Sequence, residues 1–245
     1  MQSAAVHVAL VPWDSDESAT MLARSKHKAD FFSLANNFVS QDNAMFCGPA
    51  TATIVLNALK LGKKDDLPVD KSSIASDEGQ YLPKDYNPYF NKYTQQNVFS
   101  DGAKTKLQVL GKPVAVNGTE KSDGGIQLRQ FATLLAGNGT DVELHVVADD
   151  LPESGIKTDM IKNLSTKGDF VIVNFARKAL GQQGGGHISP IAAYDEQSDS
   201  FLMMDVNPNR ASWVWVKSKD LIASMRTFDT VENRGYLLVS EAKKS

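Results

Sequence analysis

The apolar residues follow a helical spacing in the first half of the chain and form short strand-like runs in the second half. The clearest helical pattern covers residues 49–61, with apolar side chains at positions 54, 55, 58, 59 and 61. Gly62 and the two lysines after it are typical of a helix end. Strands are predicted at 141–147, 170–175, 188–194, 201–206, 213–216 and 236–240.

Further helices are predicted at 24–34, 103–110, 125–135, 158–165 and 219–225. Residues 63–100 contain several prolines and aromatic residues, which indicates a long ordered excursion with a short helix at 71–76. Residues 1–28 are expected to form an irregular segment that wraps around the rest, and residues 29–241 a single domain. Helices first and an antiparallel sheet later predict the α+β fold class.

Composition and charge narrow the classes of function. Hydrophobic residues make up 42% and charged residues 22% of the 245 positions, as in ordinary globular proteins. A formal net charge of −3 argues against nucleic acid as a partner, because general nucleic-acid binding depends on clustered positive charge. No apolar stretch approaches the length of a transmembrane helix, so no membrane partner is predicted.

A single cysteine, Cys47, lies directly before Gly48 and Pro49 at the start of the predicted 49–61 helix. Proline is tolerated in the first turn of a helix. The free N–H groups and partial positive charge of a helix N-terminus favour a thiolate over a thiol. The segment therefore presents either a nucleophile or an ordinary buried cysteine.

A second segment supplies a candidate base. His187 follows three glycines, and the runs 188–194 and 201–206 are separated by a polar turn. If the runs pair as an antiparallel hairpin, positions whose numbers sum to about 395 face one another, and His187 and Asp205 lie at the same end. A thiol, an imidazole and a carboxylate are the three parts of an activated nucleophile.

Each of these residues also has a structural interpretation. His187 alone could be a hydrogen-bonded surface residue, and Asp205 could cap the following turn. Gln41, six positions before Cys47, is either an exposed side chain or an amide donor to a developing oxyanion. The three glycines before His187 indicate backbone packed closely against a neighbour, as beside a substrate channel.

With these residues in place, the sequence resembles the phytochelatin synthases, in particular the short prokaryotic phytochelatin synthase-like proteins. The resemblance runs in order from about residue 29 to residue 240. The matching segments are 30–34, 38–41, 46–48, 54–59, 86–89, 94–97, 170–174, 185–190, 204–206 and 234–236.

The resemblance implies a papain-like cysteine transpeptidase fold acting on glutathione, without a cofactor and with a role in heavy-metal detoxification. The thiolate attacks the peptide bond between cysteine and glycine, glycine leaves, and a γ-glutamylcysteinyl acyl-enzyme remains. Water or a second glutathione then takes the acyl group. The implied roles are nucleophile for Cys47, base and acid for His187, orienting carboxylate for Asp205 and oxyanion donor for Gln41.

The resemblance also implies that Asn174, Arg177 and Gly186 line the γ-glutamyl site, with Arg234 as a further cationic candidate. The sequence departs from the family at Pro208, where plant and cyanobacterial relatives carry an arginine. Cleavage of glutathione is therefore better supported than the synthesis of long phytochelatins.

The remaining expectations concern metals, partners and location. One cysteine and four scattered histidines predict no built-in metal site, so a metal would arrive as a thiolate complex of glutathione. Prokaryotic relatives suggest a homodimer. The abundance of glutathione favours the cytoplasm, although a periplasmic protein whose signal peptide had been removed would look the same.

Two other functions remain open at this stage. One is a peptidase resembling the bacteriocin-processing cysteine peptidases, which also place a glutamine before Cys-Gly. The other is a non-catalytic protein that binds glutathione or metal thiolates through a vestigial site.

Overall fold

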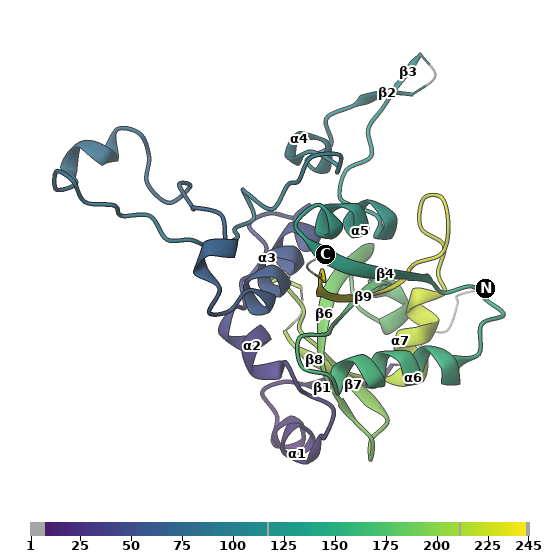
Figure 1. Ribbon diagram of the computed structural model, residues 1–245. Coiled ribbons are helices and arrows are strands. Elements are labelled where there is room, and N and C mark those ends of the chain that lie inside the picture. Colours follow the sequence, from purple (N-terminus) through teal and green to yellow (C-terminus); the bar gives the residue numbers. More distant parts are fainter. Residues whose placement is uncertain (1–7, 117, 211, 244–245) are drawn as a thin grey trace.

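The computed structural model describes residues 8–116, 118–210 and 212–243, which form a mixed α+β fold as the sequence predicts (Figure 1). Its main sheet has seven antiparallel strands in the order β1-β8-β7-β6-β5-β9-β4, and β2 and β3 form a separate hairpin. The strands are β1 (Val11–Pro12), β2 (Val114–Val116), β3 (Thr119–Lys121), β4 (Thr140–Val146), β5 (Phe170–Ala176), β6 (Gly186–Asp195), β7 (Ser200–Met203), β8 (Val214–Lys217) and β9 (Gly235–Glu241).

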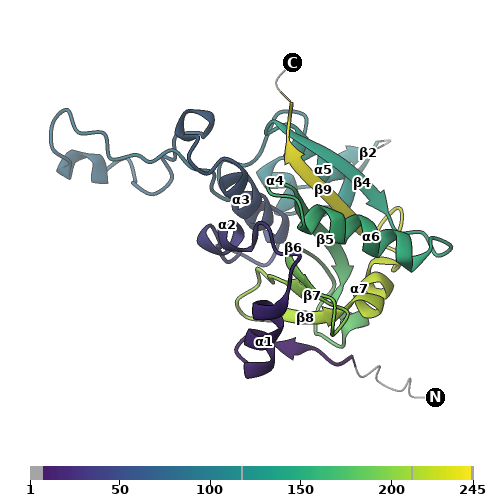
Figure 2. The ribbon, with the colours of Figure 1, turned by 60° about the horizontal axis from the view of Figure 1, so that its bottom comes forward.

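Helices cover both faces of the main sheet. Helices α3 and α5 pack on one face, and α6 and α7 pack on the other (Figures 1 and 2). The helices are α1 (Asp16–Arg24), α2 (Phe31–Asn36), α3 (Cys47–Leu59), α4 (Lys106–Val109), α5 (Leu128–Ala136), α6 (Glu153–Leu164) and α7 (Ser218–Met225), with 3-10 turns η1 (Lys64–Asp66), η2 (Glu78–Tyr81) and η3 (Arg177–Leu180). None of these helices has the length and apolar character needed to span a membrane.

The two faces of the sheet carry two separate hydrophobic cores, and β5 contributes to both. Phe170 and Ile172 belong to the core under α3 and α5, whereas Val171 and Val173 belong to the core under α6 and α7. Successive side chains of a strand point to opposite faces, so a strand buried on both sides reads as a continuous apolar run. This explains why the central strands lack the alternation of a half-exposed sheet.

The predicted hairpin of β6 and β7 is confirmed with its register. Tyr194 pairs with Phe201 and Asp195 with Ser200, so that the paired numbers sum to 395. A bulge between Ile191 and Ala193 shifts the register by one residue toward the open end. Strand β7 ends at Met203, earlier than predicted, and Asp205 lies two residues beyond it.

The first 28 residues differ from the expectation of an irregular segment. Residues 1–7 lie outside the described residues, but α1 occupies 16–24 and β1 pairs with β8. Ser15 caps α1 by accepting a hydrogen bond from the backbone N–H of Ser18 (3.1 Å). The helix predicted at 24–34 is therefore wrong: α1 ends where it should begin, and α2 starts only at residue 31.

The chain between α3 and α4 forms a long arm that projects from the body in both views (Figures 1 and 2). The helix predicted at 71–76 is absent, and the arm carries 3-10 turns at 64–66 and 78–81 instead. Asn57 on α3 holds the base of the arm, because its side chain donates to the carbonyl of Tyr93 (2.9 Å) and accepts from the N–H of Tyr93 (2.8 Å).

Candidate active site

Cys47 is the first residue of α3, as the sequence predicts, and it is a free cysteine that is only partly buried. The helix approaches the segment that leads into α5 so closely that a Cβ on Gly48 would overlap the side chain of Ile126. Glycine after the cysteine thus allows the helix N-terminus to sit against its neighbour. Cys47 accordingly lies at a helix start, where the residue packs against the core and stays partly exposed.

His187 and Asp205 come together at the open end of the β6–β7 hairpin. The Nε2 atom of His187 donates to Oδ1 of Asp205 over 3.0 Å, and both residues are buried. The imidazole also hydrogen-bonds Cys47. Because Nε2 is held by the carboxylate, Nδ1 is the nitrogen left for the sulfur. The structure thus joins the predicted thiol, imidazole and carboxylate in one chain of hydrogen bonds.

The protonation of the Cys47 and His187 pair follows from their contacts. Burial, the largest single influence, raises the pKa of the Cys47 thiol, but the hydrogen bond and charge of His187 and the N–H groups of Ile188 and Gly48 outweigh it, so the pKa is lowered. Burial lowers the pKa of His187, yet its bonds to Asp205 and Cys47 outweigh that effect and raise the pKa. Both shifts favour a thiolate beside an imidazolium.

Asp205 is itself held by three donors. Its Oδ1 accepts from His187, from Nη2 of Arg177 (2.8 Å) and from the backbone N–H of Asn207 (2.8 Å). Burial raises the pKa of this carboxyl, but His187 and Arg177 more than offset the burial, and the pKa is lowered. The bond to Asn207 is the turn cap that the sequence also predicts for Asp205. Asp205 therefore caps the turn and binds His187 at the same time.

The lowered pKa of Cys47 predicts alkylation at unusually low pH. The rate with iodoacetamide should reach half of its plateau below the ordinary thiol pKa of about 8.5, because the thiolate forms earlier as the pH rises. In His187→Ala the midpoint should move to higher pH, because burial then raises the pKa of the Cys47 thiol without the opposing effect of the imidazole. Rate against pH measures this without background, because Cys47 is the only cysteine. Equal midpoints in the two proteins would contradict the pairing.

Gln41 precedes α3 and is tied to the segment that follows Asp205. Its backbone N–H donates to the carbonyl of Val206 over 2.8 Å, and its Nε2 donates to the carbonyl of Asn43 over 2.7 Å. Its Oε1 is buried and has no hydrogen-bond partner among the described residues. Since Nε2 carries two hydrogens and donates one of them to Asn43, the other hydrogen is left for a further acceptor.

Three of the four predicted substrate residues form a polar cluster beside His187. Asn174 lies on β5, Gly186 opens β6, and Arg234 directly precedes β9. A Cβ on Gly186 would lie 2.9 Å from Nη2 of Arg234, so glycine allows the guanidinium to pack against the strand. Asp229 joins the cluster: it accepts from Nη2 of Arg234 (2.9 Å) and from Nδ2 of Asn174 (3.4 Å).

Asp229 is the residue that sequence reasoning missed in this cluster. It lies in the loop before β9, where the spacing to Arg234 follows no helix or strand period. The only signal in the sequence is an acidic residue five positions before a singled-out arginine. The Nε atom of Arg234 is buried without a partner among the described residues, which leaves one donor of the guanidinium unused.

Arg177 makes its side-chain contacts outside this cluster, and its place in the γ-glutamyl site stays a prediction. Its guanidinium pairs with Oδ2 of Asp205 (2.7 Å) and donates to Oε1 of Gln182 (2.9 Å), and the residue is 3% exposed. Gly184, at φ +121°, makes room for it: a Cβ there would meet Cδ of Arg177 at 3.0 Å. The glycines before His187 thus accommodate two arginine side chains.

Within the described ranges, no group of three or more His, Cys, Asp or Glu residues is arranged to hold a metal ion.

The match to a family model and the similarity to known proteins indicate the same family. The model of the phytochelatin synthase family matches residues 1–73 and 81–236. The chain is similar to the glutathione gamma-glutamylcysteinyltransferase of Schizosaccharomyces pombe, with 26% identity over 212 residues, 86% of this chain and 43% of the relative. It is also similar to glutathione gamma-glutamylcysteinyltransferase 3 of Lotus japonicus, with 29% identity over 217 residues, 88% of this chain and 38% of the relative. The chain therefore spans less than half the length of these curated relatives.

Proposed function

Because this chain belongs to the phytochelatin synthase family, we propose that it is a cysteine-nucleophile acyltransferase that cleaves glutathione and transfers its γ-glutamylcysteinyl group. The observation that carries the proposal is the hydrogen-bonded chain from Cys47 through His187 to Asp205. The relatives named glutathione gamma-glutamylcysteinyltransferase act on glutathione, and glutathione contains a peptide bond that such a thiolate can attack.

The arrangement of elements supports a papain-like fold in one catalytic domain over residues 29–241. The nucleophile begins a central helix, the base lies on strand β6 of the sheet against which that helix packs, and its carboxylate lies just after strand β7. The order of the three residues along the chain also matches that of papain-type enzymes, in which the cysteine comes first.

In the first step, the Cys47 thiolate attacks the carbonyl carbon of the Cys-Gly bond and a C–S bond forms. The negative charge that develops on the carbonyl oxygen is stabilised by the free N–H of Gln41 and the backbone N–H groups at the start of α3. His187 donates its proton to the glycine nitrogen, the C–N bond breaks, and glycine leaves. A thioester of γ-glutamylcysteine then remains on Cys47.

In the second step, His187 acts as a base toward the molecule that attacks the thioester. If water attacks, γ-glutamylcysteine is released and the thiol is restored. If the amine of a second glutathione attacks, a longer γ-glutamyl peptide forms. Pro208 replaces the arginine of plant relatives, and Arg210 nearby is exposed, so hydrolysis is proposed as the main outcome.

The cluster of Asn174, Gly186, Asp229 and Arg234 is suited to the γ-glutamyl end of the substrate. That end carries an α-carboxylate and an α-ammonium, for which the unused Nε donor of Arg234 and the carboxylate of Asp229 are complementary. The cluster adjoins His187 in the chain through Gly186, which supports a position near the reacting sulfur.

Metal ions are proposed to reach the site bound to the thiol of the substrate. Glutathione whose thiol carries a soft metal retains the Cys-Gly bond, so such a thiolate complex can occupy the same site. A homodimer, which the resemblance implies, stays a prediction that light scattering after gel filtration would test.

Incubation of the purified protein with glutathione tests the function. Release of glycine and γ-glutamylcysteine under reducing conditions, with and without cadmium, is expected. Cleavage of a leader peptide ending in two glycines with no action on glutathione would favour the bacteriocin-type peptidase. Glutathione binding without any turnover would favour the non-catalytic binding protein.

Gln41→Ala should lower the rate of glycine release about 10²- to 10³-fold, the usual effect of removing one oxyanion donor. Gln197→Ala, which removes an exposed amide in the β6–β7 turn, is the matched control and should keep the full rate. The comparison of kcat in the two variants measures the effect. Full activity of Gln41→Ala would remove this residue from the mechanism and leave the other assignments standing.

A further inference from the structure

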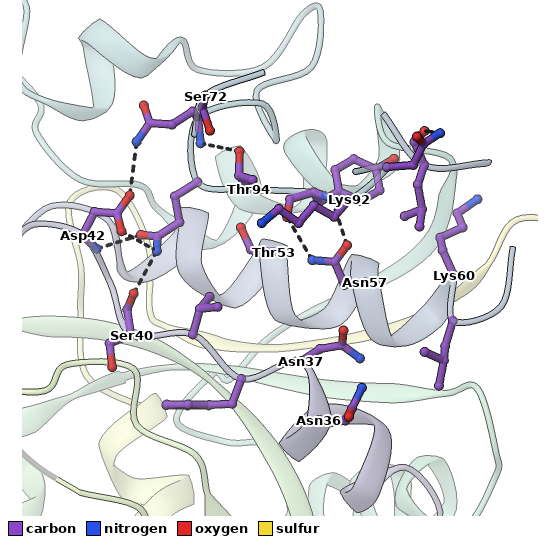
Figure 3. Close-up of a pocket in the computed structure, with 18 of the residues that line it drawn as sticks. Asn36, Asn37, Ser40, Asp42, Thr53, Asn57, Lys60, Ser72, Lys92 and Thr94 are labelled. Carbon is purple, nitrogen blue, oxygen red and sulfur yellow. Dashed lines mark hydrogen bonds between the residues drawn. The ribbon is translucent and has the colours of Figure 1, made fainter. Parts of the chain in front are cut away.

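Gln95, near the base of the arm, binds the residues on both sides of Gln41. Its side chain is held in the interior, since the residue is only 5% exposed. Its Oε1 accepts from the backbone N–H of Asp42 (2.9 Å), and its Nε2 donates to the backbone carbonyl of Ser40 (2.8 Å). Nε2 also donates to Oδ1 of Asp42 (3.0 Å). Figure 3 draws these bonds at Ser40 and Asp42 as dashed lines.

These contacts fix the backbone before and after the Cα atom of Gln41. The carbonyl of Ser40 and the N–H of Gln41 belong to one planar peptide group, and the N–H of Asp42 belongs to the next. The first group is held by Gln95 and by the carbonyl of Val206, which accepts from the N–H of Gln41 over 2.8 Å. The second group is held by Gln95. Because φ and ψ of Gln41 are the rotations between these two planes, the bonds set both angles.

The side chain of Gln41 depends on that backbone for its direction. Its Nε2 donates to the carbonyl of Asn43 (2.7 Å), and its Oε1 is buried without a partner among the described residues. Asn43 belongs to the same short loop, so this bond moves with the loop. The direction of the free Nε2 hydrogen therefore follows from the backbone that Gln95 holds.

Gln95 is in turn connected to the helix that Cys47 begins. Asn57 on α3 binds both the N–H and the carbonyl of Tyr93, two residues before Gln95 (Figure 3). The nucleophile helix and the segment of Gln41 are thus linked by two sets of hydrogen bonds and the short stretch 93–95 between them. An oxyanion donor requires such a link, because it acts only from a fixed place relative to the reacting carbon.

We propose that Gln95 is a positioning residue for the oxyanion donor, which holds the Gln41 amide toward the carbonyl oxygen of the bond that Cys47 attacks. This inference rests on the proposed cleavage of glutathione. Gln95 acts through Gln41 and not on the substrate. A misplacement of about 1 Å in such a site can cost about 10²-fold in rate, so the effect is measurable.

Gln95→Met, which keeps the unbranched shape and removes the amide, tests the proposal. It should lower kcat for glycine release about 10- to 100-fold. KM should change little, because the charge on the oxyanion develops only in the transition state. Gln96→Met is the matched control: Gln96 is exposed and bonds the side chain of Asp42 (3.1 Å) rather than its backbone, so the variant should keep the full rate.

A double variant separates positioning from a general structural effect. Gln41→Ala/Gln95→Met should be hardly slower than Gln41→Ala alone, because Gln95 has no other route to the reaction. If Gln95→Met does not fold, Gln95→Asn replaces it. That variant keeps an amide, but it is one methylene shorter and does not span both backbone groups, so its kcat should fall as well. Full kcat, a rise in KM alone, or losses that multiply in the double variant would overturn the proposal.

Hydrogen exchange measured by NMR tests the contacts of Gln95 without the reaction. The backbone amide of Asp42 loses its acceptor in Gln95→Met and should exchange faster than in the wild type, while the amides of α3 stay unchanged. Gln96→Met should exchange like the wild type. Unchanged exchange at Asp42 in Gln95→Met would overturn the proposal. If the wild type released no glycine, the proposed function would fail, and the exchange rates would still decide whether Gln95 holds this segment.

Discussion

Cys47→Ser is expected to stop glycine release from glutathione, with a loss of at least about 10⁴-fold in the single-turnover rate. The serine hydroxyl fits the same space, but at neutral pH it is not ionised by the imidazole as the thiol is, so the attacking anion is missing. Rapid-quench measurement of free glycine gives the rate. The unfolding midpoint should stay close to that of the wild type, because the substitution replaces only the sulfur.

His187→Ala is the partner experiment for that result. Groups that act as one unit lose activity together, so the double variant Cys47→Ser/His187→Ala should be hardly slower than either single variant. Losses that multiply in the double variant would indicate that the two residues act independently, against the hydrogen bond between them.

Arg177→Met is expected to lower the free energy of unfolding by about 3–5 kcal/mol, because it removes the buried guanidinium that pairs with the carboxylate of Asp205. Denaturant unfolding at several pH values measures this. The folded-state pKa of Asp205 is depressed, so its contribution to stability is present above the unfolded pKa and is lost as the pH falls through the folded pKa. The difference between the variant and the wild type should therefore be largest near neutral pH and shrink in acid.

The kinetics of Arg177→Met separate two roles of this residue. If Arg177 holds the triad carboxylate, kcat should fall together with stability, because His187 loses its fixed partner. If Arg177 instead bound the α-carboxylate of the substrate, KM would rise with kcat and stability unchanged, which would contradict the structure-based role. Lys178→Met, the exposed neighbour on η3, is the matched control and should affect neither quantity.

Local sequence signals were sufficient to place Cys47 at a helix start and His187 near Asp205. Cys47 before Gly48 and Pro49 predicted a helix start, and α3 begins at that residue. The two apolar runs around a polar turn fixed the register of the β6–β7 hairpin, because a strand slip of one residue would have exposed its buried face. That register brought His187 and Asp205 to the same end.

Contacts between distant segments were not accessible in the same way. Arg177 chemically suits both a substrate carboxylate and the carboxylate of Asp205, and only the fold shows that it pairs with Asp205, in the space that Gly184 leaves for its stem. Asp229 lies in a loop whose course depends on the packing of Arg234. Helix α1 was missed because the stretch around its cap, Ser15, is polar and the apolar face of the helix itself is short.

The intact mass of the protein, quenched with acid within one turnover on glutathione, shows whether Cys47 forms the acyl intermediate. We expect a species heavier than the free protein by γ-glutamylcysteine less one water, located by peptide mapping on Cys47 and absent from Cys47→Ser. Glycine release at full rate from Cys47→Ser, or an adduct on any other residue, would contradict it.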